Sequence, residues 1–184
     1  MRFGKGDSRS WNVVAVARDG LTGAALEALK TVGEFRTAGY PRVLVGEVAP
    51  EGGLVETVAG CVAANPPLAR TLHRVVPVED AVLFDGDDVT ETLCERFEGM
   101  GERIAARSFH VRVHLRGLKG RLQTPAVELA LGGFLYDRAE ALGRPPSVSF
   151  DDPDVVVAVE VVGRRVGYGF LEREQRALPL IWRA

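Results

Sequence analysis

The segment Ser108-Phe-His-Val-Arg-Val-His-Leu-Arg116 alternates two kinds of side chain along its length. Every second position is apolar: Phe109, Val111, Val113 and Leu115. The positions between them carry imidazole or guanidinium groups: His110, Arg112, His114 and Arg116. Successive side chains of a strand point to opposite faces of its sheet. The segment therefore predicts a β-strand with an apolar back, which faces a core, and a basic front.

The charge around this segment also departs from the rest of the chain. No Asp or Glu occurs between Glu102 and Glu128, and residues 117–120 form a glycine-containing turn. Arginine can hold a phosphate through two parallel hydrogen bonds, and glycine lets a ligand approach the backbone. The segment and its flanks are therefore a candidate surface for an RNA backbone. The predicted RNA-binding residues are Arg107, His110, Arg112, His114, Arg116, Lys119 and Arg121.

Two interpretations of the basic front remain open. In the first, the histidines donate hydrogen bonds or stack, and phosphates are contacted by Arg112, Arg116, Lys119 and Arg121. In the second, the front is the solvated face of a half-exposed sheet, and its arginines pair with acids such as Glu128 or Glu160.

The composition limits the class of protein. A hydrophobic content of 46% and a charged content of 26% are typical of a soluble globular chain. The formal net charge of −2 argues against a protein that coats nucleic acid indiscriminately. The N-terminus lacks the apolar run of a signal peptide, and no stretch approaches the roughly 20 apolar residues that cross a bilayer. We expect a cytoplasmic protein that binds neither a membrane nor DNA.

The first half of the chain predicts a ferredoxin-like module over residues 11–84, after a flexible lead-in over residues 1–10. Apolar β-branched runs indicate strands, helical spacing of apolar residues indicates helices, and Pro77 places the last strand at an edge or a bulge. The order is β-α-β-β-α-β, with an antiparallel sheet covered by two helices. The predicted elements are a strand at 11–18, a helix at 21–32, strands at 35–38 and 43–48, a helix at 54–64 and a strand at 73–84.

The second half, residues 85–184, predicts another α/β domain. A helix over residues 90–106 precedes the basic strand. Thr124 is placed to cap a helix that begins with Pro125 and runs to about Leu142. Gly132 and Gly133 within that helix predict close backbone packing. Strands follow at residues 155–162 and 166–171, and residues 172–184 are expected to be irregular or to form a short edge strand.

This second half resembles the THUMP domain family. That family has a strand of the form Phe-x-Val-x-x-x-x-Arg, a helix, and then an Asn- or Asp-Pro-Asp step into a strand that ends near an acidic residue. The matching positions in this chain are Phe109, Val111, Arg116, Asp152, Pro153, Asp154 and Glu160. The resemblance implies an α+β protein in which a ferredoxin-like module and a THUMP-like domain together bind the acceptor region of tRNA.

THUMP domains accompany tRNA-modifying enzymes such as 4-thiouridine synthetases, tRNA guanine methyltransferases and pseudouridine synthases, and occur in the adaptor for tRNA cytidine acetylation. Few residues follow Leu171 in this chain, which leaves no room for such a catalytic domain. Among members of the family, the chain therefore resembles the stand-alone adaptor. We expect a non-catalytic protein that binds tRNA and presents it to a partner modification enzyme, with cytidine acetylation as one possible reaction.

Two other functions remain as alternatives: a protein-interaction module that binds no RNA, and a small enzyme with a carboxylate or histidine site. The enzyme is the weakest, because no nucleophile, base and orienting group fall into a recognisable arrangement. Neither a GxGxxG nor a GxxxxGK pattern is present, and Cys61 and Cys94 lack the spacing of metal ligands. The expectation is therefore no cofactor and no metal.

Overall fold

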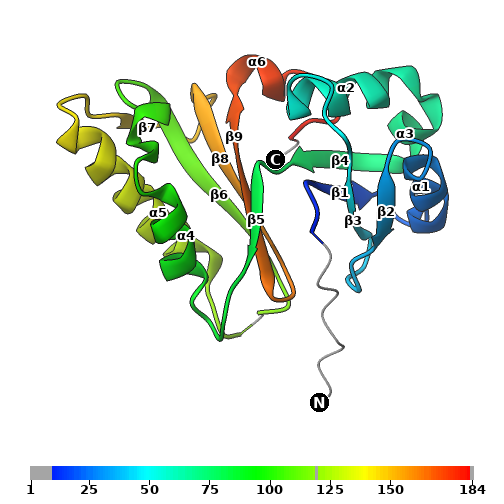
Figure 1. The fold of residues 1–184 in the computed structure, drawn as a ribbon, viewed down its shortest axis with the longest axis horizontal. Helices are drawn as coiled ribbons and strands as arrows, with labels where there is room; N and C mark the ends of the chain where they lie inside the picture. The colour runs from blue at the N-terminus through cyan, green and yellow to red at the C-terminus, as the bar shows by residue number, and fades with distance from the viewer. Residues whose placement is uncertain (1–9, 119, 183–184) are drawn as a thin grey trace. The chain divides into compact units, whose positions relative to one another are not determined.

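The computed structural model describes residues 10–118 and 120–182 of an α+β protein with two β-sheets (Figure 1). Within these residues the chain forms two compact units, one from residues 10–81 and 174–182 and the other from residues 82–173. The sequence placed the division at residue 84 and assigned the C-terminal residues to the second unit. The predicted lead-in over residues 1–10 lies outside the described residues except for Ser10.

The first unit has the predicted β-α-β-β-α-β order, with one short helix added. Its four strands form an antiparallel sheet in the order β2-β3-β1-β4, so Pro77 lies in an edge strand as predicted. The added helix begins at Pro66, where the proline ring suits a first helical turn. The elements are β1 (Val13–Ala17), α1 (Thr22–Leu29), β2 (Glu34–Thr37), β3 (Val43–Glu47), α2 (Leu54–Ala64), α3 (Pro66–Thr71) and β4 (Leu72–Pro77).

The C-terminal segment packs on the first unit, beside β4. The Val75 N–H donates to the Leu180 carbonyl at 2.8 Å, and the Trp182 N–H donates to the Val75 carbonyl at 3.2 Å. The segment is buried at Leu180, Ile181 and Trp182. Burial of these apolar side chains stabilises its packing in the first unit. It follows the short helix α6 (Arg173–Arg176) and forms a single β-bridge to β4.

The second unit is built around a mixed five-stranded sheet in the order β5-β9-β8-β6-β7. The basic segment forms β6, which runs parallel to β7 and β8, and β8 and β9 form an antiparallel hairpin. The prediction of one strand over residues 73–84 is wrong. The structure has two strands there: β4 belongs to the first sheet and β5 to the second. The elements are β5 (Asp80–Leu83), α4 (Val89–Phe97), a 3₁₀ turn (Met100–Arg103), β6 (Ser108–Arg116), α5 (Thr124–Ala141), β7 (Ser147–Val148), β8 (Val155–Val162) and β9 (Arg165–Glu172).

The apolar back of β6 lies in the core of this unit, as the alternation predicted. Phe109 and Val113 are almost fully buried, together with Phe97 of α4 and Leu131 and Leu135 of α5. Figure 1 shows α4 and α5 on one side of the strands β6, β8 and β9. The opposite face of the sheet therefore carries the alternate positions of β6, and these are the predicted RNA-binding side chains.

Two helix details differ from the prediction. The helix expected over residues 90–106 stops at Phe97, because Gly99 takes a left-handed conformation with φ of 80° and a 3₁₀ turn follows. Thr124 is the first residue of α5, so the cap position falls on Gln123, whose side chain makes no capping hydrogen bond. The ends of both helices are therefore set by backbone conformation rather than by side-chain caps.

The prediction of close packing at Gly132 and Gly133 is wrong. A Cβ atom at Gly132 would meet Val111 at an ordinary 3.9 Å, and one at Gly133 would meet no atom within 4 Å. The close approach to α5 occurs instead at Gly101, where a Cβ would lie 2.7 Å from the backbone carbon of Arg138. The 3₁₀ turn can therefore lie against α5 only because residue 101 has no side chain.

Candidate nucleic-acid interface

The basic front of β6 includes a carboxylate from the neighbouring strand. In the parallel register of β6 and β8, His114 lies opposite Glu160 and Arg116 lies opposite Val162. Glu160 is completely buried, and a buried carboxylate is costly unless cations and hydrogen bonds compensate it. The groups that compensate the charge of Glu160 are therefore less free to contact a ligand, and they lie near the end of β6.

Arg116 and His114 both lie against this carboxylate. A guanidinium nitrogen of Arg116 donates a short hydrogen bond to Glu160 Oε2, and His114 Nδ1 lies 3.3 Å from Oε1. The Arg116 side chain is only 14% exposed. The second sequence interpretation, in which an arginine pairs with Glu160, matches this contact. Arg116 compensates the buried charge of Glu160. If its guanidinium moved to a phosphate, Glu160 would lose this compensation.

The Arg112 side chain is more exposed than that of Arg116 and lies farther from its acidic neighbour. Its side chain is 47% exposed, and its guanidinium lies 3.9 Å from Glu128 Oε1. The same Glu128 oxygen accepts a hydrogen bond from the Val113 N–H at 2.9 Å. Strand β7 pairs only with Ser108 and Phe109, so this N–H lies on the open edge of β6 and Glu128 satisfies it. Glu128 therefore has a structural role that does not require Arg112. Of the two arginines of the basic front, Arg112 is the one better placed to contact a ligand.

The predicted residues on either side of β6 also have acidic partners. Arg107 forms a two-bonded ion pair with Glu172, with one of its bonds at 3.1 Å. Arg121 is 50% exposed and lies 2.8 Å from Asp87. Lys119, the other predicted phosphate contact, lies outside the described residues. Of the flanking cations that the structure describes, Arg121 is therefore the one best placed to exchange its acid for a phosphate.

His110 does not lie on an open surface. The residue is 9% exposed, and its Nδ1 lies 2.8 Å from the Ser149 carbonyl oxygen, which accepts a hydrogen bond from it in the matching tautomer. Its ring stacks against the Phe150 ring, with 5.5 Å between the centroids and 25° between the planes. His110 thus supports Phe150, which is strongly exposed and is not among the residues predicted from the sequence. The available signal was an aromatic residue isolated among serine and aspartate in residues 147–152.

The Asp-Pro-Asp segment before β8 is hydrogen-bonded to the first residue of β6. The Asp154 carboxylate accepts hydrogen bonds from the Ser108 N–H at 2.9 Å and from its hydroxyl at 2.7 Å. These two bonds are the main cause of a lowered pKa of Asp154, and the charges of Arg173 and Arg107 lower it further. Arg173 also lies 3.1 Å from Asp154 Oδ1. The motif therefore fixes where β6 begins relative to β8 and β9.

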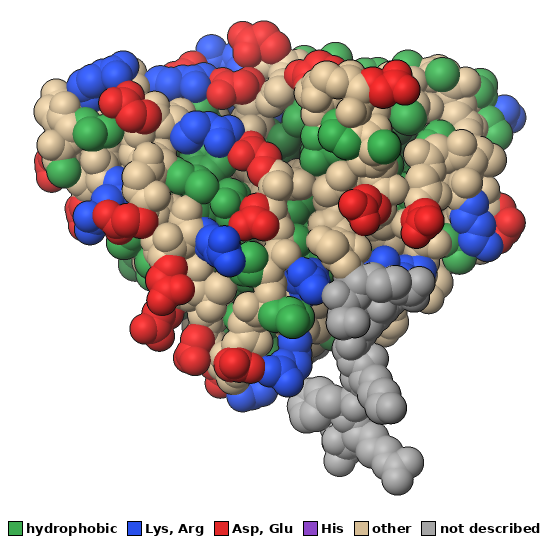
Figure 2. Space-filling view, viewed as in Figure 1, with side chains coloured by type: hydrophobic (Ala, Val, Ile, Leu, Met, Phe, Trp, Pro, Cys, Tyr) green, Lys and Arg blue, Asp and Glu red, His purple; other side chains and the backbone are tan. Residues whose placement is uncertain are grey.

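The surface charge is mixed rather than uniformly basic. On the face drawn in Figure 2, Lys and Arg side chains alternate with Asp and Glu side chains. Arg138 lies 3.2 Å from Glu98, and Arg144 lies 3.0 Å from Glu102. Exposed pairs of this kind contribute less than about 1 kcal/mol each, so they can exchange partners. An anionic ligand at this surface would therefore meet paired arginines at defined positions rather than a broad positive field.

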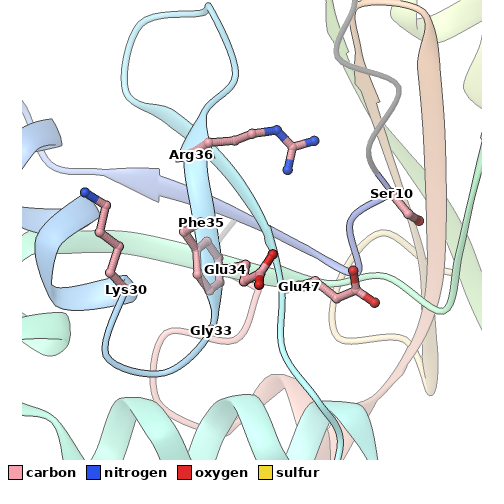
Figure 3. A pocket seen from close by; sticks show the side chains of 7 residues that line it. All are labelled: Ser10, Lys30, Gly33, Glu34, Phe35, Arg36 and Glu47. Carbon is pink, nitrogen blue, oxygen red and sulfur yellow. The ribbon is translucent and has the colours of Figure 1, made fainter.

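The first unit has an open depression of about 470 Å³ at the end of α1 and the edge of its sheet (Figure 3). Its charged lining is mixed, and Lys30 is paired with Glu27 at 2.7 Å. Neither histidine nor cysteine is among its lining residues. The described residues contain no group of three potential metal ligands and no helix long and apolar enough to cross a bilayer. The lining residues are Ser10, Lys30, Gly33, Glu34, Phe35, Arg36 and Glu47.

Comparison with family models and with the sequences of curated proteins gives no match. Several solved structures do match. TrmN from Thermus thermophilus is 22% identical, with a TM-score of 0.60 over 88% of this chain and 45% of TrmN. PH1313 from Pyrococcus horikoshii is 15% identical, with a TM-score of 0.53 over 88% of this chain and 55% of PH1313. A 4-thiouridine synthetase in complex with RNA is 14% identical, with a TM-score of 0.56 over 88% of this chain and 41% of the synthetase.

The chain thus spans only about half of the length of the structures that it matches. At these identities the likeness is one of fold, and it covers both sheets because it extends over 88% of the chain. The protein is an α+β chain with two sheets, and its fold resembles the THUMP-containing region of such proteins, as the motif from Phe109 to Glu160 implied.

Proposed function

We propose that this protein binds tRNA and presents it to a separate enzyme that modifies it. The observation that carries the proposal is the shared fold with a 4-thiouridine synthetase solved in complex with RNA, over 88% of this chain. TrmN shares the same fold over a similar part of the chain. Because this part is less than half of either of those proteins, we assign to it substrate binding rather than chemistry.

In this proposal the role of the chain is non-catalytic. His110 Nδ1 lies beside the Ser149 carbonyl, and His114 Nδ1 lies beside Glu160. In this proposal the partner enzyme provides the reaction, for which cytidine acetylation is one candidate. The protein would act in the cytoplasm, where tRNA and its modification enzymes meet.

Arg112 and Arg121 are the proposed main phosphate contacts. Each is about half exposed and faces one acid across a surface contact. A phosphate that replaces such an acid gains a charge-assisted, two-bonded contact with guanidinium at little electrostatic cost. Lys119 remains a proposed contact. Arg107, His110, His114 and Arg116 are proposed to position the surface through their partners and to add weaker contacts.

The test is a titration of total tRNA at several salt concentrations, with wild type and with the double variant Arg112→Ala, Arg121→Ala. Loss of two phosphate contacts should lower the dependence of log K on log salt by about 1.4–1.8, according to whether single- or double-stranded RNA is contacted. The matched control is Arg138→Ala with Arg144→Ala, which removes the same charge from two other exposed ion pairs. Equal salt slopes for all three proteins would overturn the assignment of these contacts.

One observation favours the second candidate, a protein-interaction module. The outer face of α5 is apolar near its N-terminus, where Leu129 is 79% exposed beside exposed Ala126 and Ala130. An apolar exposed helix face is typical of a surface that contacts another protein. The adaptor proposal needs such a surface too. The two candidates differ in the gel shift of total tRNA, because a module without RNA binding gives no shift at micromolar protein and moderate salt.

A further inference from the structure

The ring of Phe150 lies in the loop between β7 and β8 and has no place in the core. The residue is 81% exposed, although phenylalanine gains more from burial than most side chains. Single exposed apolar residues are common on protein surfaces, so exposure alone does not indicate a site. The contact between this ring and a buried side chain provides the second observation.

One face of the Phe150 ring is covered and the other is open. His110 stacks on the covered face, and the hydrogen bond of its Nδ1 with Ser149 fixes the orientation of the imidazole. His110 is itself nine-tenths buried, so the ring beneath Phe150 belongs to the body of the unit. The open face therefore extends a stack of two rings that begins inside the protein.

The loop that carries Phe150 is held in place from both sides. The Ser149 N–H donates to the Phe109 carbonyl at 3.1 Å, and the Ser149 hydroxyl donates to the Asp151 carbonyl at 3.0 Å. Arg173 donates to the Asp152 carbonyl at 2.8 Å. A ring presented by such a loop loses little conformational entropy when a ligand stacks on it.

The charge beside the ring selects the kind of ligand. Asp151 follows Phe150 directly and is exposed, and the Asp152 carboxylate lies 3.1 Å from Arg173. Arg173 also pairs with Asp154, so three carboxylates lie here with one guanidinium, and this balance disfavours a phosphate-rich duplex backbone. The carboxylates suit the edge of a base that carries an exocyclic amino group, because a carboxylate accepts a hydrogen bond from such a group.

We infer that Phe150 is a stacking platform for one unpaired nucleobase of the bound RNA, with an amino group of that base directed to Asp151. Unpaired bases stack on aromatic side chains, whereas bases inside a stem cannot reach them. The inference rests on the proposed RNA binding and adds to it a contact that reads single-stranded nucleotides. It places this contact at the start of β6, apart along the strand from the phosphate contact of Arg112.

The test uses one RNA stem-loop in four forms: blunt, and with a short 3′ tail of adenosine, cytidine or uridine. Wild type should bind the adenosine and cytidine tails more tightly than the blunt form, and the uridine tail less tightly than these two. Phe150→Ala and Phe150→Leu should each weaken binding of the amino-bearing tails by about 10-fold and leave the blunt form unchanged. Leu83→Ala, which truncates another exposed apolar side chain of the same unit, should bind all four forms as wild type does.

Phe150→Trp provides a second measurement. An indole should keep the stack, and its fluorescence should be quenched when an adenosine-tailed RNA is added, after subtraction of the signal of buried Trp11 and Trp182. Unchanged binding of every form by Phe150→Ala would overturn the platform and leave the proposed function standing. An equal loss on blunt and tailed RNA would overturn the preference for an unpaired base. Failure of wild type to bind any RNA would overturn the proposed function itself.

Discussion

Replacement of Arg116 by alanine should destabilise the second unit strongly, because it leaves the carboxylate of Glu160 without its main cation. Glu160 is fully buried, and the Arg116 guanidinium is paired with its carboxylate. Removal of one member of a buried ion pair costs about 3–5 kcal/mol. The Arg116 side chain is 14% exposed, so water can partly reach the vacated position, which places the expected loss near the lower limit, about 3 kcal/mol.

This loss can be measured by thermal unfolding followed with far-ultraviolet circular dichroism. For a unit of the size of residues 82–173, each 1 kcal/mol lowers Tm by about 4–8 °C, so the expected decrease is about 12–24 °C. Arg112→Ala is the matched control, because it removes the same side chain from the same face of the same strand. Its exposed contact at 3.9 Å should cost only about 0.5 kcal/mol, or about 2–4 °C.

A third variant separates charge from packing. Arg116→Met together with Glu160→Leu removes both charges and keeps apolar volume, and such replacements are often neutral or stabilising. The double variant should therefore melt well above Arg116→Ala. Melting of Arg116→Ala within about 4 °C of wild type would contradict the role given to Arg116, and so would a double variant that is as unstable as Arg116→Ala alone.

Glycine substitutions and one carboxylate substitution should also change the stability of the second unit. Gly133→Ala should raise the free energy of unfolding by about 0.5–1 kcal/mol, because the added methyl group meets open space and favours the helix, and denaturant unfolding would show it. In the same assay Gly101→Ala should lower stability by about 1–3 kcal/mol, since its Cβ would lie 2.7 Å from backbone. Asp154→Asn should be less stable than wild type at neutral pH. The pKa of Asp154 is lowered on folding, so its stabilising effect is present above the unfolded pKa of about 4 and is lost as the pH falls through the folded pKa. A stability difference between wild type and Asp154→Asn that stayed constant between neutral pH and pH about 3 would contradict this assignment.

Local patterns were sufficient to predict most of the fold. Period-two alternation placed the buried side of β6 correctly, and the order of helices and strands placed the first sheet. The division of residues 73–84 between two sheets was missed, because Val75 and Val82 are equally apolar and no local signal says which sheet each joins. The C-terminal packing of Ile181 on β4 was missed for the same reason, since it depends on a contact between residues about one hundred positions apart.

The availability of the site residues could not be predicted from the strand alone. His110, Arg112, His114 and Arg116 form a uniform row in the sequence, but each meets a different neighbour. The parallel register with β8 brings Glu160 to the last two, and the loop after β7 brings Ser149 and Phe150 to the first. These neighbours are distant in sequence, so the row becomes heterogeneous only in the folded chain.

The shortness of β7 leaves Arg112 as the available member of that row. Because β7 ends opposite Phe109, the edge of β6 beyond it is open, and the Val113 N–H needs an acceptor there. Glu128 from α5 satisfies that N–H and so remains in place when Arg112 moves away. Arg116 lacks this freedom, because the buried Glu160 depends on it. A variant that removes both arginines would confuse lost binding with lost stability, whereas we expect Arg112→Ala with Arg121→Ala to lower the proposed RNA affinity on an intact fold.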